Sequence, residues 1–300
     1  MKSIAAAALV AALPAVSFAQ TVTVQDAQGE ATVPAAPETV AVFDLAAIDT
    51  MSALGIEIDG VPDITPPTYL SDVFDGAQIV GTVFEPDFEE LAVMQPDLIV
   101  AGGRSQTQVA ALSDLAPTLD MTIEAGDVVS EAKARATAYG EIFDRAEAAD
   151  EAVATLDAEI AEAADAVDGK GDVLVLMANG GKISAYGSGS RFGWIHTVLN
   201  LPEARENLKT EDHGEAVSFE FVAETDPDWI FVIDRGAAIG REGEAAQATL
   251  DNPLVRGTKA GQAGQILYLD PAPLYLAGGG LRSMKVTLDE ITQAFADADS

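Results

Sequence analysis

Cysteine is absent from the 300-residue sequence, which excludes structural disulfides, thiolate metal sites and cysteine nucleophiles. It also excludes lipid attachment through an N-terminal cysteine, so we expect the mature chain to be unanchored. Histidine is nearly as scarce, because His196 and His213 are the two that the chain contains. A zinc site made of histidines alone is therefore excluded, and a Ser–His–Asp triad has no support in the sequence.

Positive charge is also scarce. There are 16 Lys and Arg residues against 49 Asp and Glu, and the formal net charge is −33. Nucleic acid and anionic lipid surfaces are thus excluded as partners, and most of the acidic residues are expected to form a solvated surface. The few arginines then gain weight, because an anionic ligand needs a local positive site. Apolar residues make up 48% of the chain, enough for a sizeable core.

The first 19 residues have the pattern of an export signal. Lys2 is followed by an apolar stretch over 4–16 and by the small-x-small sequence 17–19, which predicts cleavage after Ala19. The alternative is a buried N-terminal helix, since the apolar run is too short to span a membrane. Export without a lipid anchor indicates a periplasmic location.

Apolar strand-like runs alternate with helical segments along most of the remaining chain, a pattern typical of α/β folds. We expect an N-terminal lobe over 20–127, a linker helix over 128–168 and a C-terminal lobe over 169–300. A hairpin is expected over 21–33 and short helices over 45–54 and 88–94, with an amphipathic helix over 281–295. The expected strands are 39–43, 56–61, 78–80, 97–101, 172–177, 182–186, 229–233 and 265–269.

The stretch 128–167 is rich in Ala, Glu and Asp and has apolar residues at helical spacing. This predicts one long helix joining two lobes, with a kink allowed near Gly140. The alternative is an acidic linker of low complexity. The helix is expected to end at the turn-forming residues 168–171.

An internal repeat relates residues 88–104 to residues 219–235. The two stretches, FEELAVMQPDLIVAGGR and FEFVAETDPDWIFVIDR, are identical at seven of seventeen positions without a gap. Each predicts a short helix, a Pro-Asp turn and a buried strand, followed directly by Arg104 or Arg235. Because open α/β sheets bind ligands beyond the carboxyl ends of their strands, both arginines are expected in one cleft between two similar lobes. The alternative is a local ion pair for each.

Signatures of catalysis are missing. The glycine-rich stretch 186–191 lacks the Gly-Lys-Ser/Thr of a phosphate-binding loop, and no nucleophile elbow or helical zinc-protease motif occurs. Gly278-Gly279-Gly280 could bind an anion at the start of the last helix, but a tight turn is the better prediction. We expect His196 to be packed or to cap a helix, whereas His213 lies in a polar segment that could reach a cleft.

Six stretches together resemble the periplasmic binding proteins for ferric siderophores of the enterobactin and petrobactin type. They are VGTVFEPDFEEL, QPDLIVAGGRS, NGGKISAYGSGSRFGWIH, HGEAVSFEFV, DPDWIFVIDRGAAIG and LYLDPAPLYLAGGGL. The resemblance extends over essentially the whole chain after the signal. It implies two Rossmann-like lobes bridged by a single long helix, the class III architecture with limited hinge motion.

The resemblance implies a function in iron import without catalysis and without an intrinsic cofactor. The Fe(III) arrives inside an anionic catecholate siderophore, and a membrane permease dimer of an ABC importer receives it from a monomeric binding protein. Bis-catecholate, mixed catecholate–citrate and linear tris-catecholate ligands all remain open.

Particular residues acquire roles from this resemblance. The residues that match a cleft triad are Arg104, Arg191 and Arg235, and the matching iron ligands are His213 and Tyr275. Tyr186, Trp194 and Phe192 could pack against catechol rings or belong to the core.

Two glutamates of the repeat, Glu89 and Glu220, match the residues with which relatives dock on the permease, one on each lobe. A carboxylate at a helix start that complements the dipole is the simpler explanation for each.

Two alternatives stay open from the sequence. A haem-binding protein of the same architecture would use Tyr275 or His213 as the axial ligand and would need an apolar slot. A secreted α/β hydrolase would need an activated nucleophile or a metal-bound water, for which the sequence shows no candidate.

Overall fold

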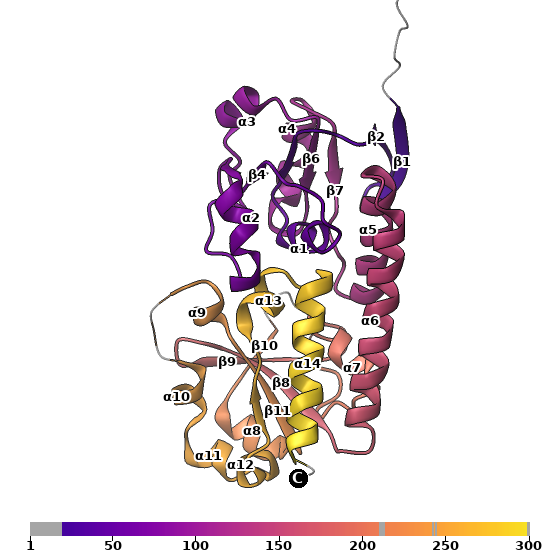
Figure 1. Cartoon of the computed structure of the whole chain (residues 1–300). Coiled ribbons are helices and arrows are strands. Elements are labelled where there is room, and N and C mark those ends of the chain that lie inside the picture. Colours follow the sequence, from indigo (N-terminus) through magenta and orange to yellow (C-terminus); the bar gives the residue numbers. More distant parts are fainter. Residues whose placement is uncertain (1–19, 210–213, 242, 244, 299–300) are drawn as a thin grey trace, which may run out of the picture.

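The computed structural model describes residues 20–209, 214–241, 243 and 245–298, which form two α/β lobes stacked end to end (Figure 1). The N-terminal lobe contains a five-stranded parallel sheet in the order β5-β4-β3-β6-β7. Its strands are β3 (Val40–Val42), β4 (Gly60–Val61), β5 (Gln78–Ile79), β6 (Leu98–Ala101) and β7 (Thr118–Asp120). Strands β1 (Thr21–Asp26) and β2 (Gly29–Pro34) form a separate antiparallel hairpin, as expected.

Short helices connect the strands of this lobe, as crossovers between parallel strands require. They are α1 (Leu45–Ala53), η1 (Thr68–Leu70), α2 (Ser71–Gly76), α3 (Phe88–Met94), η2 (Gly103–Gln108) and α4 (Val109–Ser113). The sequence patterns located α1 and α3 to within one residue, whereas the strand expected over 56–61 is only the two residues of β4.

The C-terminal lobe has a mixed sheet in the order β10-β9-β8-β11-β12, in which β8, β11 and β12 are parallel and β9 is antiparallel to both of its neighbours, β8 and β10. Its strands are β8 (Val173–Asn179), β9 (Lys182–Tyr186), β10 (Glu215–Val217), β11 (Trp229–Asp234) and β12 (Ile266–Tyr268). Its helices are α7 (Trp194–Val198), α8 (Phe219–Thr225), α9 (Arg235–Ala238), α10 (Ala246–Leu250), α11 (Pro253–Arg256), α12 (Lys259–Ala263), α13 (Pro271–Leu276) and α14 (Leu281–Ala298).

The internal repeat folds the same way in both lobes. Helices α3 and α8 each end at a residue in the left-handed conformation, Gln95 with φ 53° and Asp226 with φ 49°. Strands β6 and β11 begin three residues later, and each is an inner strand with a parallel neighbour on both sides. The two arginines that close the repeat therefore stand at equivalent strand ends, as the sequence predicts.

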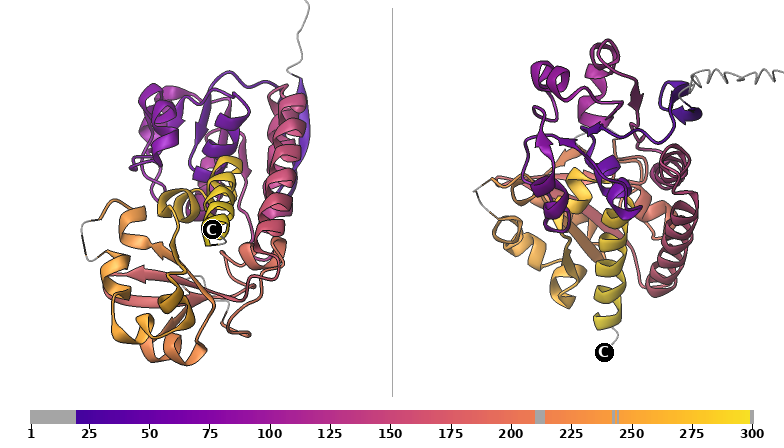
Figure 2. Two further views of the ribbon diagram at one scale, coloured as in Figure 1. Left: turned by 60° about the horizontal axis from the view of Figure 1, so that its bottom comes forward. Right: turned by 45° about the horizontal axis from the view of Figure 1, so that its top comes forward.

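The connection between the lobes differs from expectation. In place of one helix over 128–167 there are two, α5 (Val128–Ile142) and α6 (Ala146–Val167). The chain reverses at Asp144, which has φ 55°, and an ion pair between Lys133 and Asp157 shows that the two helices lie antiparallel. Gly140 allows their close approach, because a Cβ there would lie 2.7 Å from that of Ala149. Helix α6, about 33 Å long, then runs to the C-terminal lobe (Figure 2).

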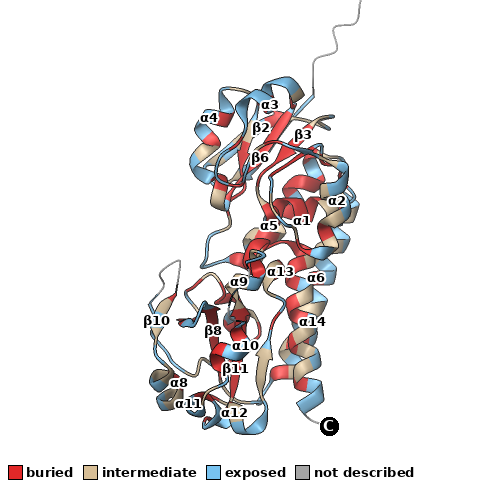
Figure 3. Ribbon diagram, turned by 90° about the vertical axis from the view of Figure 1, so that its left-hand side faces the viewer, coloured by how far each residue is buried: buried red, intermediate tan, exposed pale blue. Residues whose placement is uncertain are grey.

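Apolar packing does not stop at the lobe boundary. Buried residues gather in the sheets of both lobes (Figure 3), and Leu45 and Val83 of the N-terminal lobe belong to the same apolar cluster as Tyr275, Leu276 and the inner face of α14. Burial of apolar surface is the dominant favourable term in such contacts, so wide separation of the lobes is opposed.

A buried carboxylate at this boundary occupies the start of α14. Asp49, on α1, is 0% exposed and accepts hydrogen bonds from the backbone N–H groups of Arg282 (2.8 Å) and Ser283 (3.0 Å) and from the hydroxyl of Tyr69 (2.5 Å). Gly280 leaves it room, since a Cβ there would lie 2.5 Å from the Asp49 Cγ. The glycines before the last helix thus form a turn around the chain's own carboxylate.

Burial raises the pKa of Asp49 from 3.8 to about 6, although the hydrogen bonds from Tyr69, Arg282 and Ser283 oppose the shift. The native state therefore binds a proton that the unfolded chain binds only below about pH 4. This group adds stability as the pH falls through 6, and its contribution is lost as the pH rises. We expect it to add about 1 kcal/mol to the free energy of unfolding between pH 7.5 and pH 5.0.

Urea unfolding of the wild type and of Asp49→Asn at these two pH values tests that expectation. The gain in stability on acidification should be smaller in Asp49→Asn by about 1 kcal/mol. The exposed Asp72→Asn removes one negative charge without a buried group and should keep the full gain. Equal gains in all three proteins would contradict the assignment to Asp49.

Candidate functional site

Three arginines reach the space between the lobes from three separate segments. Arg104 lies in η2, directly after β6, and Arg235 begins α9, directly after β11. Arg191 lies in the loop between β9 and α7. All three are partly exposed.

The three side chains surround Tyr275 on α13. Their guanidinium carbons lie 5.4 Å (Arg104), 4.8 Å (Arg191) and 5.7 Å (Arg235) from the centre of its ring. The Arg235 Nε donates to the Tyr275 hydroxyl at 2.9 Å, and Arg191 Nη2 donates to the Tyr275 carbonyl at 2.8 Å. The arginines that the sequence analysis selected therefore lie together with the expected tyrosine.

Arg104 makes this cluster an interlobe contact. Its Nη2 donates to the carbonyl of Tyr275 at 2.9 Å and its Nη1 to that of Leu276 at 3.2 Å. These carbonyls lie in the last turn of α13, where a helix leaves its C=O groups without intrahelical partners and carries partial negative charge. A guanidinium from the N-terminal lobe thus caps a helix of the C-terminal lobe.

The electrostatic setting lowers the pKa of Tyr275. Burial raises the pKa of Tyr275, but the hydrogen bond from Arg235 and the positive charges of Arg235, Arg191 and Arg104 outweigh it, so that its pKa lies below 10. A phenolate oxygen is a good ligand for a hard cation such as Fe(III), and guanidinium groups balance and hydrogen-bond anions. The cluster is suited to an anionic ligand that carries such a cation.

The aromatic residues named as ring-packing candidates are core residues in this structure. Tyr186 is 1% exposed and Trp194 4% exposed. Tyr186 packs edge-on against Phe192 at 4.8 Å, and its hydroxyl lies 3.7 Å from the Met177 sulfur. Both rings pack within the core of this structure, as the alternative interpretation expects, and their contact with a ligand stays a prediction.

The structure describes one of the two histidines, His196, but not His213. His213 lies outside the described residues, so its part in the site stays a prediction. His196 is buried, with its Nδ1 3.1 Å from the Leu201 carbonyl, and burial lowers its pKa. It is a packed residue, as expected.

Glu89 and Glu220 occupy the first turns of α3 and α8 and are exposed. Asp87 caps α3 and Ser218 caps α8, each through a side-chain oxygen that accepts backbone N–H groups. The two helices lie toward opposite ends of the molecule, one on each lobe (Figure 1). Neither glutamate belongs to the arginine cluster.

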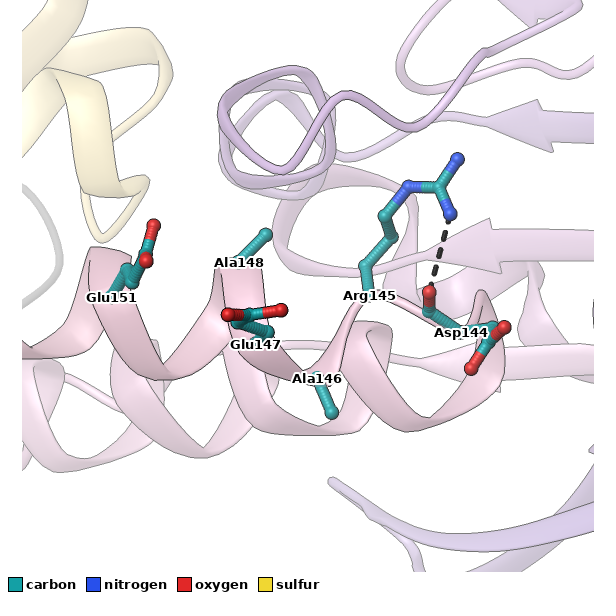
Figure 4. Close-up of a pocket in the computed structure, with 6 residues that line it drawn as sticks. All are labelled: Asp144, Arg145, Ala146, Glu147, Ala148 and Glu151. Atoms are coloured by element: carbon teal, nitrogen blue, oxygen red, sulfur yellow. Dashed lines mark hydrogen bonds between the residues drawn. The ribbon is translucent and has the colours of Figure 1, made fainter.

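A surface hollow of about 420 Å³ lies elsewhere, at the reversal between α5 and α6 (Figure 4). It is lined by Asp144, Arg145, Glu147 and Glu151 with two alanines, and Arg145 donates to the carbonyl of its neighbour Asp144. None of the predicted site residues lies there.

Within the described part of the chain, no group of His, Asp and Glu could hold a metal ion, and no helix is long and apolar enough to cross a membrane.

One acidic neighbour of the arginines, Asp44, could not be recognised as such from the sequence. Asp44 follows β3, which pairs with β6, so it lies at the same sheet edge as Arg104. Burial raises the pKa of Asp44 to about 6, and the charge of Arg104 opposes the shift. In the sequence this residue shows only the pattern of a helix N-cap, the role that it also has for α1.

Residues 40–273 match the periplasmic binding protein family, and the chain belongs to it. The petrobactin-binding protein YclQ of Bacillus subtilis is 38% identical over 265 residues, which are 86% of this chain and 83% of YclQ. The ferric-anguibactin-binding protein FatB of Vibrio anguillarum is 29% identical over 274 residues, 89% of this chain and 85% of FatB.

Solved structures agree on the fold. The crystal structure of YclQ matches with a TM-score of 0.88 and 35% identity over 92% of this chain and 99% of that one. The catecholate-siderophore binding protein VctP of Vibrio cholerae matches with a TM-score of 0.86 and 28% identity. The match covers 91% of this chain and 100% of the VctP chain. The two-lobed architecture with a helical connection is therefore the fold of this family.

Proposed function

We propose that this chain is the solute-binding component of an ABC importer and that it binds an anionic ferric siderophore of the catecholate type between its lobes. The observation that carries the proposal is the convergence of three arginines, from both lobes, around one tyrosine. In a chain with a net charge of −33, so local a positive site indicates an anionic ligand. The names of YclQ, FatB and VctP support the same class of ligand.

The chemistry of such a ligand fits the residues. Fe(III) is a hard cation that prefers oxygen donors, and a bis-catecholate supplies four of about six coordination positions. The Tyr275 phenolate would take one remaining position and the imidazole of His213 the other. The arginines would balance the negative charge and donate hydrogen bonds to catecholate oxygens. The iron enters and leaves with the siderophore and is cargo.

The alternatives have less support. Haem would need an apolar slot, whereas the Tyr275 side chain, although part of the apolar cluster, has three guanidinium groups beside its ring. The family and the relatives named above are binding proteins, and we extend this to the absence of catalysis here. We also propose that residues 1–19, which lie outside the described residues, direct export. The mature protein would then be an unanchored monomer in the periplasm, and its partner would be a permease dimer.

Fluorescence titration with a panel of ferric siderophores tests the proposed function. Trp194 and Trp229 both lie in the C-terminal lobe and report on ligand near it. Saturable quenching by at least one ferric catecholate is expected, with the metal-free siderophore and hydroxamate complexes as controls. A Soret band after incubation with haem, together with no response to any ferric catecholate, would show that the ligand is haem.

The direct iron ligands are tested by Tyr275→Phe and His213→Ala. With a tetradentate siderophore, each substitution should shift the visible catecholate-to-iron charge-transfer band, because an oxygen or nitrogen donor is lost. With a hexadentate siderophore the band should barely move, since the iron has no vacant position. Unchanged spectra of both variants with the tetradentate complex would show that the protein supplies no iron ligand from these residues.

A further inference from the structure

Among the described residues, polar contacts cross the lobe boundary at two places that differ in depth. One joins Asp49 of α1 to the start of α14, and the other joins Arg104 of η2 to the end of α13. We propose that the first is a permanent hinge contact and the second a breakable clasp, which holds the ligand-free cleft closed until an anion takes the place of the α13 carbonyls. The part played by the anion rests on the proposed function.

The Asp49 contact has the properties of a fixed point. Its carboxylate is 0% exposed, and three donors from two other segments of the fold, Tyr69 among them, satisfy it. Around it, the backbone N–H of Leu281 lies 3.4 Å from the Thr50 hydroxyl, and Arg282 donates to the hydroxyl of Ser52 at 3.1 Å. Breaking it would bury an unpaired carboxylate and expose four backbone N–H groups of an 18-residue helix.

The titratable and charged groups that face Asp49 are few. The Tyr69 hydroxyl donates a hydrogen bond to Asp49, and the positive charge of Arg282 lowers the pKa of Asp49. The Arg282 guanidinium also lies 4.9 Å from the centre of the Tyr69 ring. The charge of Asp270, the N-cap residue of α13, also acts on Tyr69, and Arg104 caps the other end of that helix. The clasp therefore involves α13 and the hinge contact involves α14, and these consecutive helices are separated by residues 277–280 alone.

The Arg104 contact has the properties of a contact that can exchange. Arg104 is partly exposed, and its two acceptors are neutral carbonyls of a six-residue helix. An anionic oxygen forms a stronger hydrogen bond with a guanidinium than a neutral carbonyl does. A catecholate that enters the cleft can therefore displace Tyr275 and Leu276 from Arg104, whereas water has no such advantage.

The movement implied is a narrow one. Leu45, in the first turn of α1, packs in the same apolar cluster as Tyr275 and Leu276, so apolar contact between the lobes remains while the hydrogen bonds of Arg104 exchange. Opening at one edge about a fixed point exposes the arginines without separating the lobes. A ligand must then supply enough negative charge to replace the Tyr275 and Leu276 carbonyls as acceptors for Arg104.

Distances between spin labels test the hinge and the clasp in the ligand-free protein. Because the chain has no cysteine, Asp114→Cys and Glu224→Cys place one exposed label on each lobe without background labelling. Adding Arg104→Gln should move the distance distribution to longer values and broaden it, with the unfolding midpoint within about 2 °C of the parent. Arg205→Gln, an exposed arginine that stacks on Phe221 within the C-terminal lobe, is the matched control and should leave the distribution unchanged.

The hinge is tested in the same labelled protein by Asp49→Asn, with Tyr69→Phe as the milder variant if Asp49→Asn does not fold. Either should lower the unfolding midpoint clearly more than Arg104→Gln does. An unchanged distribution in Arg104→Gln would overturn the clasp. Wild-type stability in both hinge variants would overturn the hinge.

Ligand is added last, as the diamagnetic Ga(III) complex of a tetradentate bis(catecholamide), so that the metal does not relax the labels. At a ligand concentration that saturates both proteins, binding should shift the wild-type distribution and leave that of Arg104→Gln nearly where it was. Binding without any shift in the wild type would overturn the exchange at Arg104. If no catecholate complex binds, the proposed function fails, while the ligand-free comparison still decides whether the clasp exists.

Discussion

Ferric siderophore should bind at least about a thousandfold more weakly when Arg104, Arg191 and Arg235 are all replaced by glutamine. A hydrogen bond to a charged group contributes about 1.5–3 kcal/mol, so each single replacement should weaken binding by a factor of ten to about 150. Glutamine keeps a polar donor but has a shorter side chain and no charge. The dissociation constant from fluorescence titration measures the effect.

The single variants are expected to differ in a second respect. The hydrogen bonds of Arg104 go to backbone carbonyls of α13, whereas Arg235 donates to the Tyr275 hydroxyl itself. Arg235→Gln should therefore alter the charge-transfer band of a tetradentate complex more than Arg104→Gln does. Arg256→Gln, which removes an exposed arginine paired with Asp251, is the control for charge alone. Wild-type affinity in all three single variants would exclude the cluster as the binding site.

The parts of the site that the sequence predicted depend on local pattern and on one general rule. Arg104 and Arg235 follow apolar runs that form inner strands, and parallel strands end at the same edge of a sheet. The repeat then fixes their equivalence, down to the left-handed residues Gln95 and Asp226 that end the two helices. Arg191 and Tyr275 came from the family resemblance, since nothing in their own surroundings in the sequence marks them.

What the sequence could not reveal depends on contacts between distant segments. The break between α5 and α6 lies at Asp144, in a stretch with strong helical periodicity, and is explained by the packing of Gly140 against Ala149. Asp49 lies within an apolar helix, and its partners are more than 200 residues away except for Tyr69. The rings of Tyr186 and Trp194 fit a cleft or a core equally well by composition, and only the packed structure assigns them to the core.

Charge reversal of two exposed glutamates is expected to abolish transport without affecting the ligand. Glu89 and Glu220 lie 131 positions apart in the repeat and occupy the same place in the first turns of α3 and α8. Interaction with the helix dipole contributes about 0.3–1 kcal/mol and explains a carboxylate at either position, but not the match between the lobes. A two-lobed protein that docks on a two-fold symmetric permease needs one equivalent contact on each lobe. We therefore propose both as docking residues.

In the double variant Glu89→Lys with Glu220→Lys, siderophore affinity should stay within about twofold of the wild type, because neither residue belongs to the arginine cluster. Uptake of the ferric siderophore through the cognate importer should fall at least about tenfold. The matched control, Glu90→Lys with Glu224→Lys, makes the same charge change at exposed positions of the same helices and should transport normally. Equal loss in both double variants would assign the effect to overall charge, and normal transport by the first would place docking elsewhere on the surface.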